Sequence, residues 1–113
     1  MALHPRMWFQ IVTPFELHHN LLWVRRAEEL IAHVYKEQEM RVPVHLGIGQ
    51  EAIAVGVCSA LNLPHDVVFA SHRCHNQYLA CGGSFEALVA ELYGRETGCS
   101  RGRGAHGHLT SRE

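Results

Sequence analysis

The 113-residue chain has no apolar run that approaches the roughly 18 residues needed to cross a membrane. Its start, Met1 to Gln10, lacks the continuous apolar core of a secretory signal peptide and holds little of the arginine and serine typical of a mitochondrial address. The formal net charge is only −1, so composition gives no general attraction to nucleic acid or to an anionic membrane. We therefore expect a cytoplasmic protein that binds neither.

Regularly spaced cysteines are also missing. The four cysteines, at positions 58, 74, 81 and 99, contain no C-x-x-C pair, and the chain has no internal repeat. Small disulfide frameworks are read from dense, paired cysteine spacings. We therefore expect free, buried thiols in a reducing compartment.

Histidine, by contrast, is abundant, with 10 copies against 10 lysines and arginines together. Unperturbed imidazole titrates between neutral and mildly acidic pH, so the net charge should become strongly positive over that interval. Apolar residues make up 47% of the chain and charged residues 19%, which is ordinary for a folded domain. The length is sufficient for one small domain with a modest core.

The pattern predicts one long amphipathic helix over residues 14–36. Thr13 can cap its start, Pro14 suits the first helical position, and Glu16 can complete a capping box. Apolar residues then recur at helical spacing, namely Trp23, Ala27, Leu30, Ile31 and Val34.

The middle of the chain predicts shorter elements. Pro43 makes residues 42–46 at best an edge strand or a loop. The helix expected over residues 50–61 is apolar on every face, so its burial requires more protein than this chain supplies. The apolar run Val67–Ala70 is typical of a buried strand.

Two short helices should follow. One is expected over residues 75–80, and Ser84 can cap another that ends at Gly94. Beyond it, glycine alternates with arginine and histidine and the apolar period is lost, so we expect residues 95–113 to form a mobile tail. Its two arginine-glycine repeats are too few to indicate RNA binding.

The segment SHRCH, residues 71–75, carries the most suggestive side chains. Ligands of open α/β sheets bind at the carboxyl ends of strands, and this segment directly follows the expected one. The planar guanidinium of Arg73 matches two oxygens of a phosphate group. His72 and His75 flank it and can donate or accept hydrogen bonds near neutral pH. One hypothesis is therefore an anionic, phosphate-bearing ligand.

Three other interpretations remain open at this point. Arg73 can instead form an ion pair with Glu51 or Asp66. The pattern G-x-G-x-x-A over residues 47–52 partly matches a dinucleotide-binding fingerprint, although the segment before it is a poor strand. A zinc site can be drawn from residues of suitable type, although their spacing is irregular: His72, Cys74, His75, Cys81, Cys99, His106 and His108.

The order of the segments resembles the amino-terminal region of 2-oxo acid dehydrogenase alpha subunits. The resemblance covers about residues 22–109 and rests on five blocks: RRAEELIAHVYKEQEMRVPVHLGIGQEA, VGVCSAL, SHRCH, YLACGG and AELYGRETGCSRGRG, the last followed by HL. The family comprises the decarboxylating components of pyruvate, branched-chain 2-oxo acid and acetoin dehydrogenase complexes.

The resemblance implies an α/β fold. This chain would be the α-rich amino-terminal portion of a thiamine-diphosphate-binding fold, truncated before most of the parallel sheet. Residues 1–12 would be an irregular lead-in, 13–94 a partial thiamine-diphosphate-binding domain and 95–113 the tail. The implied cofactors are thiamine diphosphate and magnesium, and the implied partners are a beta subunit and a lipoyl-bearing acyltransferase.

The implied activity is decarboxylation of a 2-oxo acid and transfer of the acyl group to lipoyl, with the thiazolium ring supplying the chemistry. By the same resemblance, Arg73, His72 and His75 would bind the cofactor. His45, His72 and His108 would line the catalytic end of the site.

Two departures from the family pattern are visible. The loop GAHGH replaces the family's GGSMH, and the family's GDG…N segment, which supplies the magnesium ligands, is absent from the chain. We therefore expect no metal ligands here and no detectable cofactor affinity for this chain alone. The alternatives are a non-catalytic interaction fragment that completes a split subunit, or a small zinc-binding module.

Overall fold

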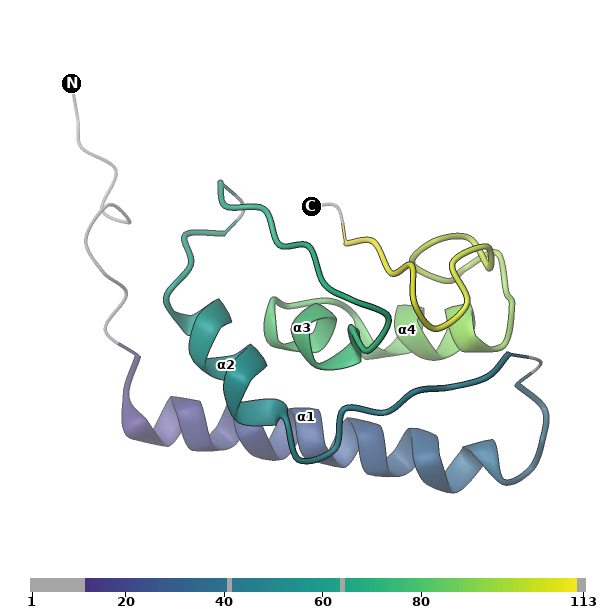
Figure 1. The fold of residues 1–113 in the computed structure, drawn as a ribbon, viewed down its shortest axis with the longest axis horizontal. Coiled ribbons are helices and arrows are strands. Elements are labelled where there is room, and N and C mark those ends of the chain that lie inside the picture. Colours follow the sequence, from purple (N-terminus) through teal and green to yellow (C-terminus); the bar gives the residue numbers. More distant parts are fainter. Residues whose placement is uncertain (1–11, 41, 64, 112–113) are drawn as a thin grey trace.

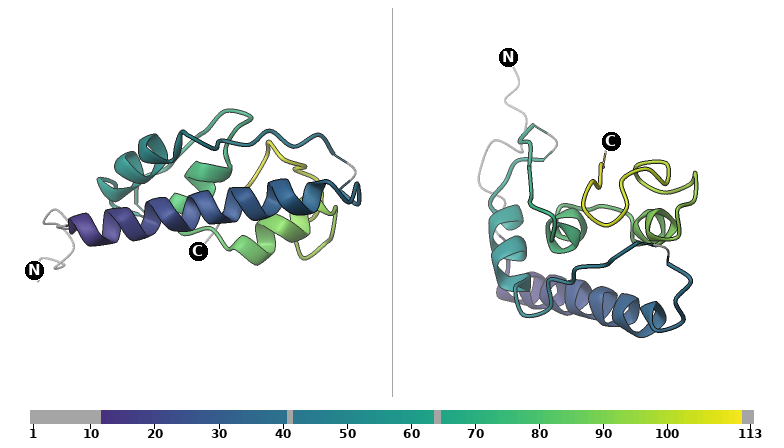
Figure 2. Two further views of the ribbon diagram at one scale, coloured as in Figure 1. Left: turned by 90° about the horizontal axis from the view of Figure 1, so that it is seen from below. Right: turned by 45° about the vertical axis from the view of Figure 1, so that its right-hand side comes forward.

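The computed structural model describes residues 12–40, 42–63 and 65–111. They contain four helices: α1 (Pro14–Tyr35), α2 (Glu51–Ser59), α3 (His75–Ala80) and α4 (Phe85–Leu92). The long α1 runs along one side of the molecule, and α2, α3 and α4 follow one another along its length (Figures 1 and 2). The lead-in expected for residues 1–12 lies almost wholly outside the described residues. No helix in these ranges is long and apolar enough to cross a membrane.

The start of α1 confirms the predicted capping box. The hydroxyl of Thr13 accepts a hydrogen bond from the backbone N–H of Glu16 at 3.2 Å, and the Glu16 carboxylate accepts one from the Thr13 N–H at 2.7 Å. Pro14 occupies the first helical position. The Thr13 N–H is the largest cause that holds the pKa of Glu16 below its ordinary value, and the Thr13 hydroxyl, which also donates to this carboxylate at 2.9 Å, lowers the pKa further.

The core is built on one stripe of α1. Val24, Ala27 and Ile31 are buried at helical spacing and pack with apolar residues of the other elements, among them Met40, Val55, Leu79, Leu88 and Leu92. Each fully buried leucine or isoleucine contributes roughly 1.5–3 kcal/mol. Trp23 and Leu30, which the pattern assigned to the same stripe, remain about half exposed. Trp23 contacts Phe85 edge-on at the rim of this core.

The buried strand predicted over Val67–Ala70 is wrong. No strand is assigned within the described ranges, and the side chains of Val67 and Phe69 are 74% and 93% exposed. A strand needs a neighbour for its backbone groups, and the described residues supply none. The outward side of α2 is similarly bare, with Ile53 and Val57 exposed, as expected of a helix that requires additional protein for its burial.

The expectation of four free thiols is also wrong. Cys58, in the last turn of α2, forms a disulfide with Cys81, the residue that follows α3. Their Cα atoms are 5.6 Å apart although they are 23 positions apart in sequence. The pairing depends on where two helices end in space, which cysteine spacing alone does not reveal. Cys74 and Cys99 are free, and burial raises the pKa of the Cys74 thiol.

Reduction of the Cys58–Cys81 disulfide should lower the free energy of unfolding by about 3 kcal/mol, since the bond closes a loop of 23 residues in the unfolded chain. Thermal unfolding followed by circular dichroism, with and without dithiothreitol, measures this. The double variant Cys58→Ser/Cys81→Ser is the control and should melt like the reduced protein, with no response to dithiothreitol. Identical melting of oxidised and reduced wild type would contradict the expectation.

Candidate functional site

A buried carboxylate on α1 joins the two segments that carry the predicted site residues. Glu28 is fully buried, and its Oε1 lies 2.7 Å from Nδ1 of His75 at the start of α3. Its Oε2 accepts a hydrogen bond from the backbone N–H of Gly47 at 2.7 Å. The carbonyl of Gly47 in turn accepts from the side-chain amide of Asn76 at 2.8 Å. The loop before α2 is thus held against α3.

A second carboxylate shapes the same loop. Glu51 accepts hydrogen bonds from the Gly49 N–H and from the guanidinium of Arg25, whose Nε lies 2.5 Å from Oε1. The Arg25 hydrogen bond is the largest cause that lowers the pKa of Glu51 to about 2. Gly49 has a φ of +95°, which a side chain rarely tolerates, so glycine suits this turn.

The ion-pair interpretation of Arg73 is not supported by this arrangement. Glu51 is paired with Arg25, and the carboxylate of Asp66 accepts a hydrogen bond from the backbone N–H of Asn62 at 2.6 Å. The Arg73 side chain is exposed, and no acidic group within the described ranges forms a salt bridge with it. A cation in this state can accept an anionic ligand without first giving up a partner.

Three histidines from distant segments lie close together, and one of them, His72, directly precedes Arg73 in sequence. Nδ1 of His45 lies 3.0 Å from Nε2 of His106. The ring of His45 also contacts the ring of His72 edge-on, with centroids 5.4 Å apart. His45 and His72 were predicted site residues, whereas His106 was not assigned to the site. His108, predicted in its place, is exposed and makes no ring contact with His45.

His106 has an altered acidity in this cluster. Burial is the largest cause that lowers its pKa, and repulsion by His45, His75, His72 and His108 lowers the pKa further. At neutral pH a lowered pKa favours the neutral ring, which can accept a proton or a hydrogen bond. His106 could have been identified from sequence only by its alternation with His108, since its neighbours lie about sixty and thirty residues away along the chain.

The tail brings His106 to this place by folding around another buried carboxylate. Glu91 of α4 is fully buried and accepts three backbone hydrogen bonds, from Ser100 and Gly102 to Oε2 and from Gly104 to Oε1, at 2.6–2.9 Å. In the GAHGH loop, Ala105 has a φ of +51°. The mobility predicted for residues 95–113 stays a prediction, but the described part of this tail follows a defined, hydrogen-bonded path.

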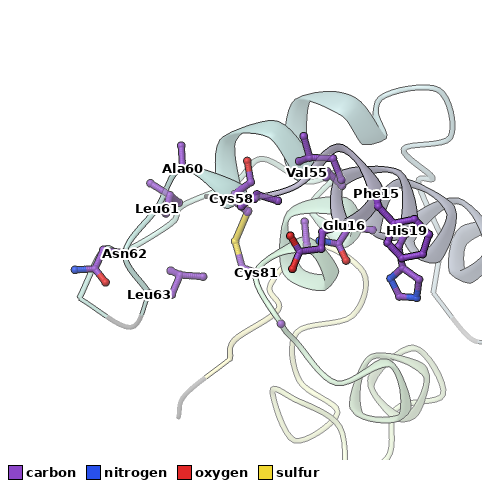
Figure 3. A pocket seen from close by; sticks show the side chains of 16 residues that line it. Phe15, Glu16, His19, Val55, Cys58, Ala60, Leu61, Asn62, Leu63 and Cys81 are labelled. Carbon is purple, nitrogen blue, oxygen red and sulfur yellow. A yellow bond between two sulfur atoms is a disulfide. The ribbon is translucent and has the colours of Figure 1, made fainter. Parts of the chain in front are cut away.

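The described residues also form a groove of about 1150 Å³ that is separate from the cluster of His45, His72 and His106 (Figure 3). Side chains from the start of α1, including Phe15 and His19, face the loop after α2, and the Cys58–Cys81 disulfide lies between them (Figure 3). His45, His72 and Arg73 do not line this groove.

Neither of the other two ligand interpretations gains support. Within the described ranges, no three histidine, cysteine or acidic side chains gather so as to hold a metal ion, so the zinc candidates do not converge there. The glycine turn before α2 is preceded by irregular backbone rather than by the strand that a dinucleotide fingerprint requires.

Residues 19–113 match the family described as the dehydrogenase E1 component. The chain belongs to this family. The resemblance to dehydrogenase alpha subunits is thereby confirmed, and named relatives support it.

Relatives of this E1 component chain include alpha subunits of the pyruvate dehydrogenase E1 component. The mitochondrial one of Saccharomyces cerevisiae is 38% identical over 97 residues, which cover 86% of this chain and 23% of the relative. The Zymomonas mobilis subunit is 39% identical over 98 residues, which cover 87% of this chain and 28% of that subunit. The Porphyra purpurea subunit is 40% identical over 95 residues, which cover 84% of this chain and 27% of that subunit. The chain thus spans about a quarter of the length of these relatives.

The Arg25–Glu51 pair should make stability sensitive to acid. The pKa of Glu51 is about 2 in the folded chain and its ordinary value is 4.5, so its stabilising effect is present above pH 4.5. That effect is lost as the pH falls from about 4.5 to about 2. Urea unfolding at a series of pH values should show a smaller acid-induced loss for Arg25→Gln than for the wild type.

Arg26→Gln is the matched control for this experiment. Arg26 is the next residue on α1 and pairs with Glu29 at the surface, where ion pairs contribute little. Its acid-side profile should therefore follow the wild type. An unchanged acid-side slope in Arg25→Gln would show that the pair does not govern this part of the profile.

The histidine cluster makes a second prediction about acidity. In His45→Ala, the pKa of His106 should rise toward its ordinary value of 6.5, because the change exposes the ring and removes a like charge. Titration of the histidine proton resonances by NMR measures this. His108→Ala should give a smaller rise, since His108 is the weakest of the named causes. A rise in His108→Ala equal to or above that in His45→Ala would refute the arrangement.

Proposed function

We propose that this chain supplies the diphosphate-binding and substrate-facing part of a thiamine-diphosphate-dependent 2-oxo acid dehydrogenase alpha subunit. The observation that carries the proposal is the exposed Arg73, which directly follows His72 in the histidine cluster. Family membership supports the reaction class, and the relatives' names support pyruvate as the first substrate to test.

The residues present fit an anionic cofactor. Arg73 would hold two diphosphate oxygens in the bidentate manner of guanidinium groups, with His72 beside it. His75 is 99% buried and its Nε2 has no hydrogen-bond partner among the described residues, so this polar atom is the one that a bound group would satisfy. Thiamine diphosphate would supply the electron sink for decarboxylation. Magnesium would have to be held outside the described residues, since these contain no cluster for it.

The histidines would serve the substrate end of the site. His45, His72 and His108 are the catalytic candidates, and the contact of His106 with His45 adds it to this group. Imidazoles close to one another can pass a proton and can stay neutral near pH 7, which suits the handling of a 2-oxo acid and its acyl product. The acyl group would then pass to lipoyl on an acyltransferase.

The exposed apolar surfaces favour a larger α/β assembly. Phe69 and Val67 project from an extended segment, and Ile53 and Val57 from the outward side of α2. These would be covered by a parallel sheet, and a beta subunit would complete the site. The same surfaces favour the second candidate, a non-catalytic fragment that completes a split subunit. We keep the cytoplasm as the predicted location.

A chimera tests the proposal. Residues 19–113 would replace the matching segment of the Zymomonas mobilis alpha subunit, produced together with that enzyme's beta subunit. The chimera should bind thiamine diphosphate with magnesium and decarboxylate pyruvate. Arg73→Gln should weaken cofactor binding about tenfold to a hundredfold, as expected for lost hydrogen bonds to a charged group. Isothermal titration calorimetry measures the affinity.

Arg95→Gln is the matched control, because Arg95 is also an exposed arginine but lies beyond the end of α4. It should bind the cofactor like the parent chimera. The 113-residue chain alone should show no detectable binding, and micromolar affinity would contradict that expectation. An assembled chimera without cofactor affinity, or one indifferent to Arg73→Gln, would overturn the proposed function.

A further inference from the structure

The surroundings of Glu28 are unusual for a carboxylate on a helix that otherwise buries apolar side chains. Its exposed fraction is 0%, and burial of an ionised group is costly unless partners compensate for the lost water. Both oxygens have a partner: Oε1 faces Nδ1 of His75 and Oε2 faces the N–H of Gly47, each at 2.7 Å. One side chain on α1 therefore contacts two segments of the candidate site at once.

The peptide of Gly47 is held from both sides. Its N–H donates to Glu28, and its carbonyl accepts from the Asn76 amide. A Cβ added to Gly47 would lie 2.5 Å from Nδ2 of Asn76, so only glycine allows this close approach. His45 lies two residues before Gly47, and the residue before Asn76 is His75. The position of the His45 loop and that of α3 are thus coupled through two side chains.

The ring of His75 is fixed in a defined state by the same carboxylate. A carboxylate in its ionised form can only accept a hydrogen bond, and opposite such a group Nδ1 of His75 carries the hydrogen. Nε2 is buried and has no partner among the described residues. Native proteins rarely leave a buried polar atom unpaired, and a catalytic role or a bound water or ion is among the explanations for such an atom. Because Nε2 of His75 is buried, bulk solvent does not supply the missing hydrogen bond.

We propose that Glu28 is the positioning residue of this site. It holds His75 with the hydrogen on Nδ1 and Nε2 available as an acceptor, and it holds the loop that bears His45 in register with α3. Glu28 reaches a ligand only through these two partners. The role of these positioned groups in a 2-oxo acid dehydrogenase rests on the proposed function above. The geometry of Glu28 itself does not.

The variant Glu28→Gln gives a sharp test, because glutamine has the shape of glutamate but only one acceptor oxygen. The N–H of Gly47 can only donate, so the amide oxygen should stay with Gly47. The amide NH₂ would then face Nδ1 of His75, which must become an acceptor. The expected result is a change of His75 from predominantly Nδ1–H to predominantly Nε2–H.

Long-range ¹H–¹⁵N NMR of the histidine rings in the full chain, above the range in which they titrate, reports these two tautomers directly. Glu29→Gln is the matched control, since Glu29 is the neighbouring residue and pairs with Arg26 at the surface. Its His75 should keep the hydrogen on Nδ1. A residue with a merely structural role would alter the melting temperature without reversing the tautomer.

Several outcomes would overturn the proposal. One is a wild-type His75 that carries its hydrogen on Nε2, and this measurement remains decisive even if Glu28→Gln does not fold. Another is a folded Glu28→Gln variant with the wild-type tautomer. The experiment requires neither cofactor nor partner, so it separates the two proposals. An inactive chimera with the predicted tautomers would refute only the function, and an active chimera with unchanged tautomers would refute only the role of Glu28.

Discussion

The arrangement of the site depends on one buried carboxyl group, that of Glu28. It lies at the middle of the longest helix, where an apolar residue would give a simpler core, and it is compensated by a ring nitrogen and a backbone N–H instead. Replacing buried ionic groups by apolar ones is often neutral for stability, so this glutamate is not explained by stability alone. Glu28 instead fixes the relative positions of α1, α3 and the loop with Gly47, because only that placement gives each carboxyl oxygen a hydrogen-bond partner.

Glu91 is a second buried carboxyl group that accepts hydrogen bonds from a loop, in another part of the chain. Glycine-rich segments have little side-chain packing to define their path, and their backbone N–H groups need acceptors when they leave water. In the tail, a single carboxylate satisfies three such groups, and the path so defined ends with His106 beside His45. Two acidic residues on two helices therefore organise both halves of the histidine cluster. Neither would attract notice in a search for catalytic side chains.

The features that could be predicted from sequence are those with local causes. The capping box at Thr13 and Glu16, the bounds of α3 and the Ser84 cap of α4 each depend on residues within one helical turn, and the structure agrees with them. His45 and His72 were assigned to one site through the family resemblance, and their rings meet. The Cys58–Cys81 bond and the inclusion of His106 depend instead on how distant segments pack. The apolar run at Val67–Ala70 shows the reverse case, since its pattern is that of a strand but a strand requires a neighbour.

The disulfide has a topological consequence for this region. It converts residues 58–81 into a covalent ring, and that ring contains the extended segment with Phe69, the cation Arg73 and the whole of α3. A polypeptide that packed along the exposed segment with Phe69 would therefore contact the same covalent ring that carries Arg73. The docking surface and the ligand-binding groups would thus lie on one closed loop of backbone. The size of this loop limits how far motions elsewhere in the chain can separate them.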